Sequence, residues 1–276
     1  MSLNAWGASL GAVVAAEGDS HFPPKVADFW QPLVTFGHVG NTTIALTRPM
    51  VVLTLVALVL SVWLVTTTRR AAAVPSKGQW FTEQVYDFVR NNVARDMIGT
   101  KDFMRFVPLL FALFTFILLS NLSGVIPGIQ MPPMARIGFP IALTLIVYVV
   151  YHWIGIKKHG GFGRYLKWMI PPGIPGWLMP LIVPLELLTY FITRPLTLAL
   201  RLFGNMFAGH MLLVVFIMGG WLLLTSGSIG LALVTIPAWI LGFVMTAFEI
   251  LVQVLQAFVF TLLAASYFGG ALADEH

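Results

Sequence analysis

Two apolar stretches in the C-terminal half of the chain are longer than a lipid bilayer is thick. One runs from Trp177 to Thr225 and the other from Ile229 to Phe268. As helices, residues 196–224 and 237–268 would extend about 43 Å and about 48 Å, whereas the hydrocarbon core of a bilayer measures about 30 Å. The sequence therefore predicts a hairpin, residues 177–268, whose two long helices are broken or strongly tilted.

Composition indicates a membrane protein. Hydrophobic residues make up 58% of the chain and charged residues 10%, with a mean hydropathy of +0.87, which is far from soluble domains. Three further apolar runs begin near Pro49, Phe106 and Phe139. The expected fold class is an all-α polytopic membrane protein with about five membrane-embedded helices. Residues 1–48 would form an N-terminal segment, and residues 49–276 a single membrane domain.

Basic residues gather in two of the loops between the expected spans. The first such loop carries Arg69, Arg70, Lys77, Arg90, Arg95, Lys101 and Arg105, and the second carries Lys157, Lys158, Arg164 and Lys167. Such loops are cytoplasmic by the positive-inside rule, which puts the N-terminus outside and the C-terminus inside. The same loops explain the formal net charge of +5 better than a nucleic-acid partner does, so none is expected.

Residues 76–97 differ from the spans because they alternate apolar and charged faces at helical spacing. The apolar positions are Phe81, Val85, Phe88, Val89 and Val93. Glu83, Asp87 and Arg90 occupy another face, which predicts an amphipathic helix on the cytoplasmic surface. A membrane-surface anchor is the favoured interpretation, and a docking face for a cytoplasmic partner is the alternative.

A permanent positive charge lies inside the apolar segment LRLFGNMFAGH, residues 200–210. The Arg201 guanidinium stays charged at any working pH, and a charge at bilayer depth is costly, so it faces protein or water. Gly204 and Ala208 leave room for another helix to approach. An ion pair with Glu186 in the same chain is not expected, because about 22 Å of helix separates them. The sequence predicts an acidic partner on another helix.

Polar side chains follow one face of each helix of the hairpin. At about 100° per residue, the first face holds Glu186, Thr189, Thr193, Thr197, Arg201 and Asn205, with His210 opposite. The second holds Thr246, Glu249, Gln253, Gln256 and Tyr267. This second stripe extends about 31 Å, close to the membrane thickness. Such groups hold water and pass protons inside membranes, so the sequence predicts a proton path.

Glu249 and His210 are the expected relay groups of that path. A buried histidine–carboxylate pair that only joins two helices is the alternative, but intramembrane ionisable groups favour the relay. For Gln253 and Gln256, interhelical hydrogen bonds offer a second explanation. The long side chain of Arg194 favours snorkelling to the membrane interface.

Metal and covalent chemistry find no support in the sequence. The chain has no cysteine, which excludes thiolate ligands and cysteine nucleophiles. The histidines outside the hairpin lack metal-ligand spacing, and neither HExxH nor GxSxG occurs. We therefore expect no catalytic residue, no metal and no cofactor.

Several motifs of this chain occur together in a known family. They are Pro195 followed by LRLFGNMFAGH (200–210), LQAFVFTLL (255–263), Glu249 seven residues before Gln256, SNLSGVIP (120–127) and VPSKGQ (74–79). From residue 74 to the C-terminus, the chain resembles subunit a of the rotary F-type ATP synthase. The resemblance implies a stationary proton-channel subunit with two aqueous half-channels, which is not an enzyme alone.

The resemblance also implies partners and residue roles. The partners would be the c-subunit ring, the peripheral-stalk b subunits, other subunits of the F-type ATP synthase and membrane lipid, in a bacterial inner membrane. Arg201 would be the essential cation facing the ring. Asn205, His210, Glu249 and Gln256 would carry the proton path, with Glu186, Gln253, Thr246 and Tyr267 as further half-channel candidates.

One position pair sets this chain apart from a common bacterial arrangement of the family. There, the residues matching His210 and Glu249 hold their identities exchanged, so this chain is more similar to the mitochondrial form. An acid and an imidazole are retained in both orders, which preserves the relay.

Two other functional classes compete with this interpretation. A self-contained proton-coupled transporter should show inverted repeats with interrupted helices, and the Arg201 hairpin has no second copy in the sequence. An intramembrane hydrolase needs a nucleophile with a base or a metal, and neither pattern is evident. Copurification with a c-ring and a soluble ATPase head distinguishes the three classes.

Overall fold

The computed structural model of the chain describes residues 32–39, 42–69, 72, 74–126, 132–170 and 175–273. Within these residues, five helical stretches are long and apolar enough to cross a membrane: Arg48–Arg69, Val107–Val125, Gly138–His159, Met179–Thr225 and Ile229–Leu272. Their first residues differ by at most two positions from those expected from the apolar runs. The all-α polytopic membrane fold is confirmed.

A small β-hairpin precedes the first long helix. Strand β1 (Pro32–Val39) pairs antiparallel with β2 (Thr42–Thr47), with irregular register near its start. The sequence analysis predicted no strand in the segment 1–48. Both strands are rich in Val, Thr and Ile, whose branched side chains favour extended backbone.

The chain divides into two compact units. One contains the described parts of Met1–Arg48 together with Leu213–Phe243, and the other those of Pro49–Leu212 and Val244–His276. In the first unit, the hairpin turns at Gly227 with φ +75°, a left-handed conformation that favours glycine. This turn lies in the polar sequence Thr225–Ser228, between helices α9 (Arg194–Thr225) and α10 (Ile229–Leu272).

The two helices approach each other closely beside this turn. The Thr235 hydroxyl donates a hydrogen bond of 3.1 Å to the Gly220 carbonyl. The Trp239 indole occupies the space that a side chain at position 220 would need. Small residues at such crossings permit close backbone packing, as is common in membrane helices.

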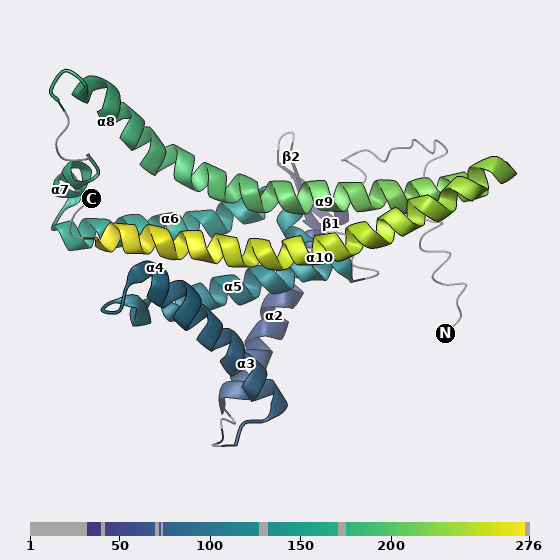
Figure 1. The fold of residues 1–276 in the computed structure, drawn as a ribbon, viewed down its shortest axis with the longest axis horizontal. Helices are drawn as coiled ribbons and strands as arrows, with labels where there is room; N and C mark the ends of the chain where they lie inside the picture. Colours follow the sequence, from purple (N-terminus) through teal and green to yellow (C-terminus); the bar gives the residue numbers. More distant parts are fainter. Residues whose placement is uncertain are drawn as a thin grey trace. The chain divides into compact units, whose positions relative to one another are not determined.

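The second unit contains the remaining helices. They are α2 (Arg48–Arg69), α3 (Lys77–Phe88), η2 (Val89–Arg95), α4 (Asp96–Ile98), η3 (Phe103–Arg105), α5 (Val107–Leu122), η4 (Ser123–Val125), η5 (Pro133–Ala135), α6 (Gly138–His159), α7 (Phe162–Trp168), α8 (Met179–Leu188) and η6 (Thr189–Thr193). Figure 1 shows α9 and α10 side by side. They are antiparallel, because Gly209 lies against Glu249 while Arg194 lies against Tyr267.

Both hairpin helices exceed the membrane thickness. Their 32 and 44 residues extend about 48 Å and about 66 Å at the usual rise per residue. Helix α10 continues through Pro237. The strong tilt that these lengths demand in a bilayer of about 30 Å stays a prediction.

A π-helical turn precedes Pro195. Proline has no backbone N–H to donate to the residue four positions earlier, and its ring crowds that carbonyl. The preceding residues, Thr189–Thr193, are wound as the π-helix η6, and α9 begins at Arg194. Single π turns of this kind are frequent at functional sites.

The amphipathic segment 76–97 is helical, and its apolar face divides into two parts. Val89 and Val93 are fully buried, whereas the Phe81 side chain is 56% exposed. The Phe88 ring lies 5.8 Å from that of Phe114 on α5. The two valines therefore pack against the rest of the chain, whereas Phe81 in the first half and Phe88 and Met97 in the second half present apolar groups outward. Its position on the cytoplasmic membrane surface stays a prediction.

Helix α7 folds back against the end of α6. A side chain at Gly155 would overlap the Tyr165 ring, so this glycine lets the tyrosine pack flat against α6. Burial raises the pKa of the Tyr165 hydroxyl to about 12, and the hydroxyl lies 3.1 Å from His152 Nδ1. The tyrosine thus stays protonated at physiological pH.

Replacing Gly269 by alanine is expected to destabilise the protein. A Cβ at this position of α10 would collide with the backbone carbonyl of Met97, and backbone cannot move aside as a flexible side chain can. We expect a loss of about 1–3 kcal/mol, measured as a lower melting temperature in detergent. The matched control is Gly270→Ala, which meets nothing within 4 Å; equal melting temperatures for the two variants would contradict the prediction.

Candidate functional site

Arg201 points away from the packed side of its helix. Its side chain is exposed on α9, whereas Leu198 and Leu202 are 2% and 1% exposed. The described residues provide Arg201 with no ion pair and no hydrogen bond. A cation in an apolar span that none of the described residues neutralises is available to a partner.

Three polar side chains of α10 form a buried row. Glu249 is 4% exposed, Gln253 fully buried and Gln256 7% exposed. Gln253 Nε2 donates to Glu249 Oε1 over 3.2 Å, one helical turn away. The stripe predicted from helical spacing therefore includes a real contact between two of its members.

Asn121, at the end of α5, extends this buried row. Its Nδ2 donates to the Gln253 backbone carbonyl over 3.3 Å. Four buried atoms around this contact form no hydrogen bond with any described residue: Ser120 Oγ, Asn121 Oδ1, Glu249 Oε2 and Gln253 Oε1. A buried polar atom without a partner costs about 1–3 kcal/mol, so this concentration marks a polar region inside an apolar bundle.

The Glu249 side chain packs against α9 at a glycine. A Cβ on Gly209 would lie 3.6 Å from Glu249 Cγ and 3.8 Å from its Oε1. The next residue, His210, is 6% exposed. Arg201 and His210 thus differ in exposure, as expected for positions on opposite sides of one helix.

The remaining predicted residues are half-buried and more widely spread. Asn205 lies on α9, Glu186 on α8, and Thr246 and Tyr267 on α10. Tyr267 is about 27 Å along α10 from Glu249. It therefore belongs to a different part of the hairpin from the buried row.

Most of the chain matches a known protein family. Residues 50–269 match the family described as ATP synthase A chain. The chain belongs to this family. A curated "ATP synthase subunit a" from Nocardioides sp. is 47% identical over 274 residues, covering 97% of this chain and 99% of the relative.

Two further relatives extend the likeness. The "ATP synthase subunit a" of Pseudarthrobacter chlorophenolicus is 38% identical over 96% of this chain and 98% of its own length. That of Streptomyces lividans is 36% identical over 99% of both chains. Membership of the subunit a family makes this chain a multi-pass membrane subunit of ATP synthase, active in proton transport and not catalytic alone. The resemblance drawn from the motifs is confirmed.

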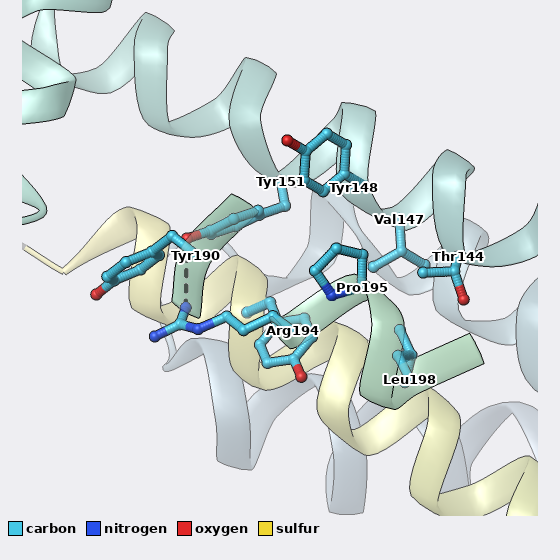
Figure 2. Close-up of a pocket in the computed structure, with 9 residues that line it drawn as sticks. Thr144, Val147, Tyr148, Tyr151, Tyr190, Arg194, Pro195 and Leu198 are labelled. Carbon is cyan, nitrogen blue, oxygen red and sulfur yellow. Dashed lines mark hydrogen bonds between the residues drawn. The ribbon is translucent and has the colours of Figure 1, made fainter. Parts of the chain in front are cut away.

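A second cation of this subunit a family member has surroundings that the sequence analysis missed. Arg194 lies among three tyrosine rings, with its Cζ 3.8 Å from the Tyr190 centroid, 5.4 Å from that of Tyr267 and 6.0 Å from that of Tyr151. Figure 2 shows Arg194 beside Tyr190 and Tyr151 and the hydrogen bond of 3.3 Å that its Nη1 donates to the Tyr151 hydroxyl. We call these four residues the arginine–tyrosine cluster.

No local sequence pattern identifies this cluster. Tyr151 precedes Arg194 by 43 residues and Tyr267 follows it by 73, so only the packing of α6 and α10 against the start of α9 brings them together. The nearest signal is Tyr190 four positions earlier, which is one turn of a helix.

Proposed function

We propose that this chain is the stationary proton-channel subunit of an F-type ATP synthase. In this role it provides two aqueous half-channels to a ring of c subunits and couples proton translocation to rotation and ATP synthesis. The observation that carries the proposal is the exposed Arg201 on a membrane-length helix, to which the described residues offer no acidic partner. In the proposal the partner is the c ring, as the resemblance of the motifs implies.

The chemistry follows from the cost of charge in lipid. A ring carboxylate that takes a proton from one half-channel becomes neutral and can turn to face lipid. After nearly a full rotation it loses the proton to the other half-channel. Arg201 keeps the carboxylate between the channels ionised and repels protons that would otherwise leak through. A membrane potential of 100 mV supplies about 2.3 kcal/mol per proton.

The buried row supports a half-channel beside this interface. Glu249, Gln253 and Gln256 with Asn121 supply carboxylate and amide groups that can bind water, and several of these groups' atoms have no hydrogen-bond partner among the described residues. Buried waters occupy polar sites of this kind. In the proposal Glu249 and His210 exchange protons with that water, and Asn205 lies on the path towards Arg201.

Partners and location follow from the same assignment. Beyond the c ring, the chain would contact the peripheral-stalk b subunits and other subunits of the F-type enzyme in a bacterial inner membrane. The basic loops favour an extracytoplasmic N-terminus and a cytoplasmic C-terminus.

Cross-linking tests this proposal directly, because the chain has no native cysteine. Ala208 follows Arg201 by seven residues and is also exposed, so it lies on nearly the same side of α9. We expect Ala208→Cys to form a disulfide with a c subunit carrying a cysteine beside its mid-membrane carboxyl group. The control is Val149→Cys. Val149 is 57% exposed on α6, and a cysteine there should form no disulfide with the c subunit. Equal yields at both positions, or none at position 208, would refute the proposed interface.

A further inference from the structure

The arginine–tyrosine cluster solves the problem of a charge at the start of a membrane helix without an acid. None of the ion pairs found among the described residues involves Arg194. Instead, the guanidinium lies over the Tyr190 ring, near two other ring faces, and donates to the Tyr151 hydroxyl. Cation–π contacts become stronger when they are shielded from water, and Tyr190 and Tyr151 are 3% and 2% exposed.

The cluster joins four helical elements of the second unit. Tyr190 belongs to η6, Tyr151 to α6 and Tyr267 to α10, while Arg194 is the first residue of α9. Figure 2 shows the Arg194 side chain extending from the start of α9 to the tyrosine on α6. The Arg194 side chain thus contacts α6 and α10, which both pack against α9.

The backbone at this point needs such a connection. The π-helical turn Thr189–Thr193 ends immediately before Arg194, and Pro195 follows. Since proline removes one helical hydrogen bond, the backbone here fixes the direction in which α9 leaves η6 less firmly than an uninterrupted α-helix would. Side-chain contacts at Arg194 can fix it.

The direction of α9 decides where Arg201 lies. Arg201 follows Arg194 by seven residues of regular α-helix, which places it about 10 Å further along the axis and about 20° around it. A change in the direction of α9 at its first turn would therefore displace the guanidinium of Arg201 from its partner.

We propose that Arg194 and its three tyrosines are a positioning clamp, which holds the start of α9 against α6 and α10 and thereby sets the position of Arg201. The clamp rests on the proposed function of Arg201 at the c ring. Arg194 itself does not meet the ring carboxylates in this scheme, because its charge is engaged by aromatic faces of its own chain.

The test measures position and coupling in the assembled ATP synthase in inverted membrane vesicles. Arg194→Leu in the Ala208→Cys background should lower the disulfide yield with the c subunit at least about fivefold, which corresponds to losing roughly 1 kcal/mol of cation–π stabilisation. Proton pumping per ATP hydrolysed should fall similarly, and passive proton leak should rise. Arg194→Lys, which keeps the charge, should restore part of both signals.

A matched pair at position 190 separates the aromatic contact from simple volume. Tyr190→Phe keeps the ring face and loses only the hydroxyl, so it should retain most of the yield and the pumping. Tyr190→Leu should lose both to the same extent as Arg194→Leu. The disulfide yield and the pumping are both divided by the amount of this chain that copurifies with the c ring. A variant that assembles poorly is then not mistaken for one in which Arg201 is displaced.

The outcomes distinguish the clamp from the function on which it rests. Absence of cross-linking through position 208 with Arg194 intact would refute the proposed function. Normal cross-linking that is unchanged by Arg194→Leu and by Tyr190→Leu would refute the clamp alone. A loss of assembled complex, with unchanged pumping per ATP in the complexes that remain, would also refute it.

Discussion

Vesicles containing Arg201→Ala are expected to hydrolyse ATP without acidifying, and to leak protons passively through the membrane sector. The exposed guanidinium is the only formal charge between Arg194 and Glu249. In the proposed function, a ring carboxylate that passes between the two half-channels without this charge can stay protonated, so rotation no longer exchanges protons in one direction. Acidification by inverted vesicles, followed with a pH-sensitive dye, should fall to the level seen without ATP.

The neighbouring residue provides the control for this experiment. Leu200 is 42% exposed on the same helical turn and carries no charge, so Leu200→Ala should pump normally. If Arg201→Ala vesicles acidify as well as those with Leu200→Ala, the charge has no role in coupling, and the proposed function fails with it.

The helices of this fold follow from the length of the apolar runs. Each expected span begins within two residues of its observed start, because a helix is the only open-chain structure that satisfies its own backbone in lipid. The β-hairpin at 32–47 and the π turn Thr189–Thr193 were not predicted. A β-hairpin depends on strand pairing, and a π turn depends on the packing around a proline. Neither therefore leaves a regular spacing of apolar residues in the sequence.

Helical geometry predicted those features of the site that lie within one helix. The opposed exposure of Arg201 and His210 and the contact between Glu249 and Gln253 both follow from about 100° per residue. The place of Asn121 in the site did not follow from helical geometry, because its hydrogen bond joins residues 132 positions apart in the sequence. The tyrosines around Arg194 were missed for the same reason, and snorkelling was favoured because the sequence does not reveal those rings.

The amphipathic segment 76–97 illustrates a limit of periodicity. Phe81, Val89 and Val93 belong to one apolar face by spacing, yet Phe81 is exposed while the two valines are fully buried. Helical spacing identifies an apolar face but not which other helix covers it. Here α5 covers part of the face, where Phe114 lies beside Phe88.

Glu249→Gln is expected to reduce proton flux at least about tenfold and to change its pH profile. The glutamine keeps the shape and can still bond to Gln253, but it cannot take up and release a proton at working pH. One titrating group is thereby removed from the proposed path. Flux through the assembled membrane sector, measured in vesicles over a range of external pH, should lose one of its pH transitions.

Exchanging the two relay residues tests whether the path needs both groups or only a fixed arrangement of helices. Gly209 brings α9 against the Glu249 side chain, and His210 is buried at the next position. The exchanged order that the family resemblance implies predicts that the site accepts either order. The double variant His210→Glu/Glu249→His should therefore recover much of the flux that Glu249→His alone loses. If Glu249→Gln leaves the flux and its pH profile unchanged, or if the double variant is no better than Glu249→His, these residues only join the two helices, and the proton path lies elsewhere in the hairpin.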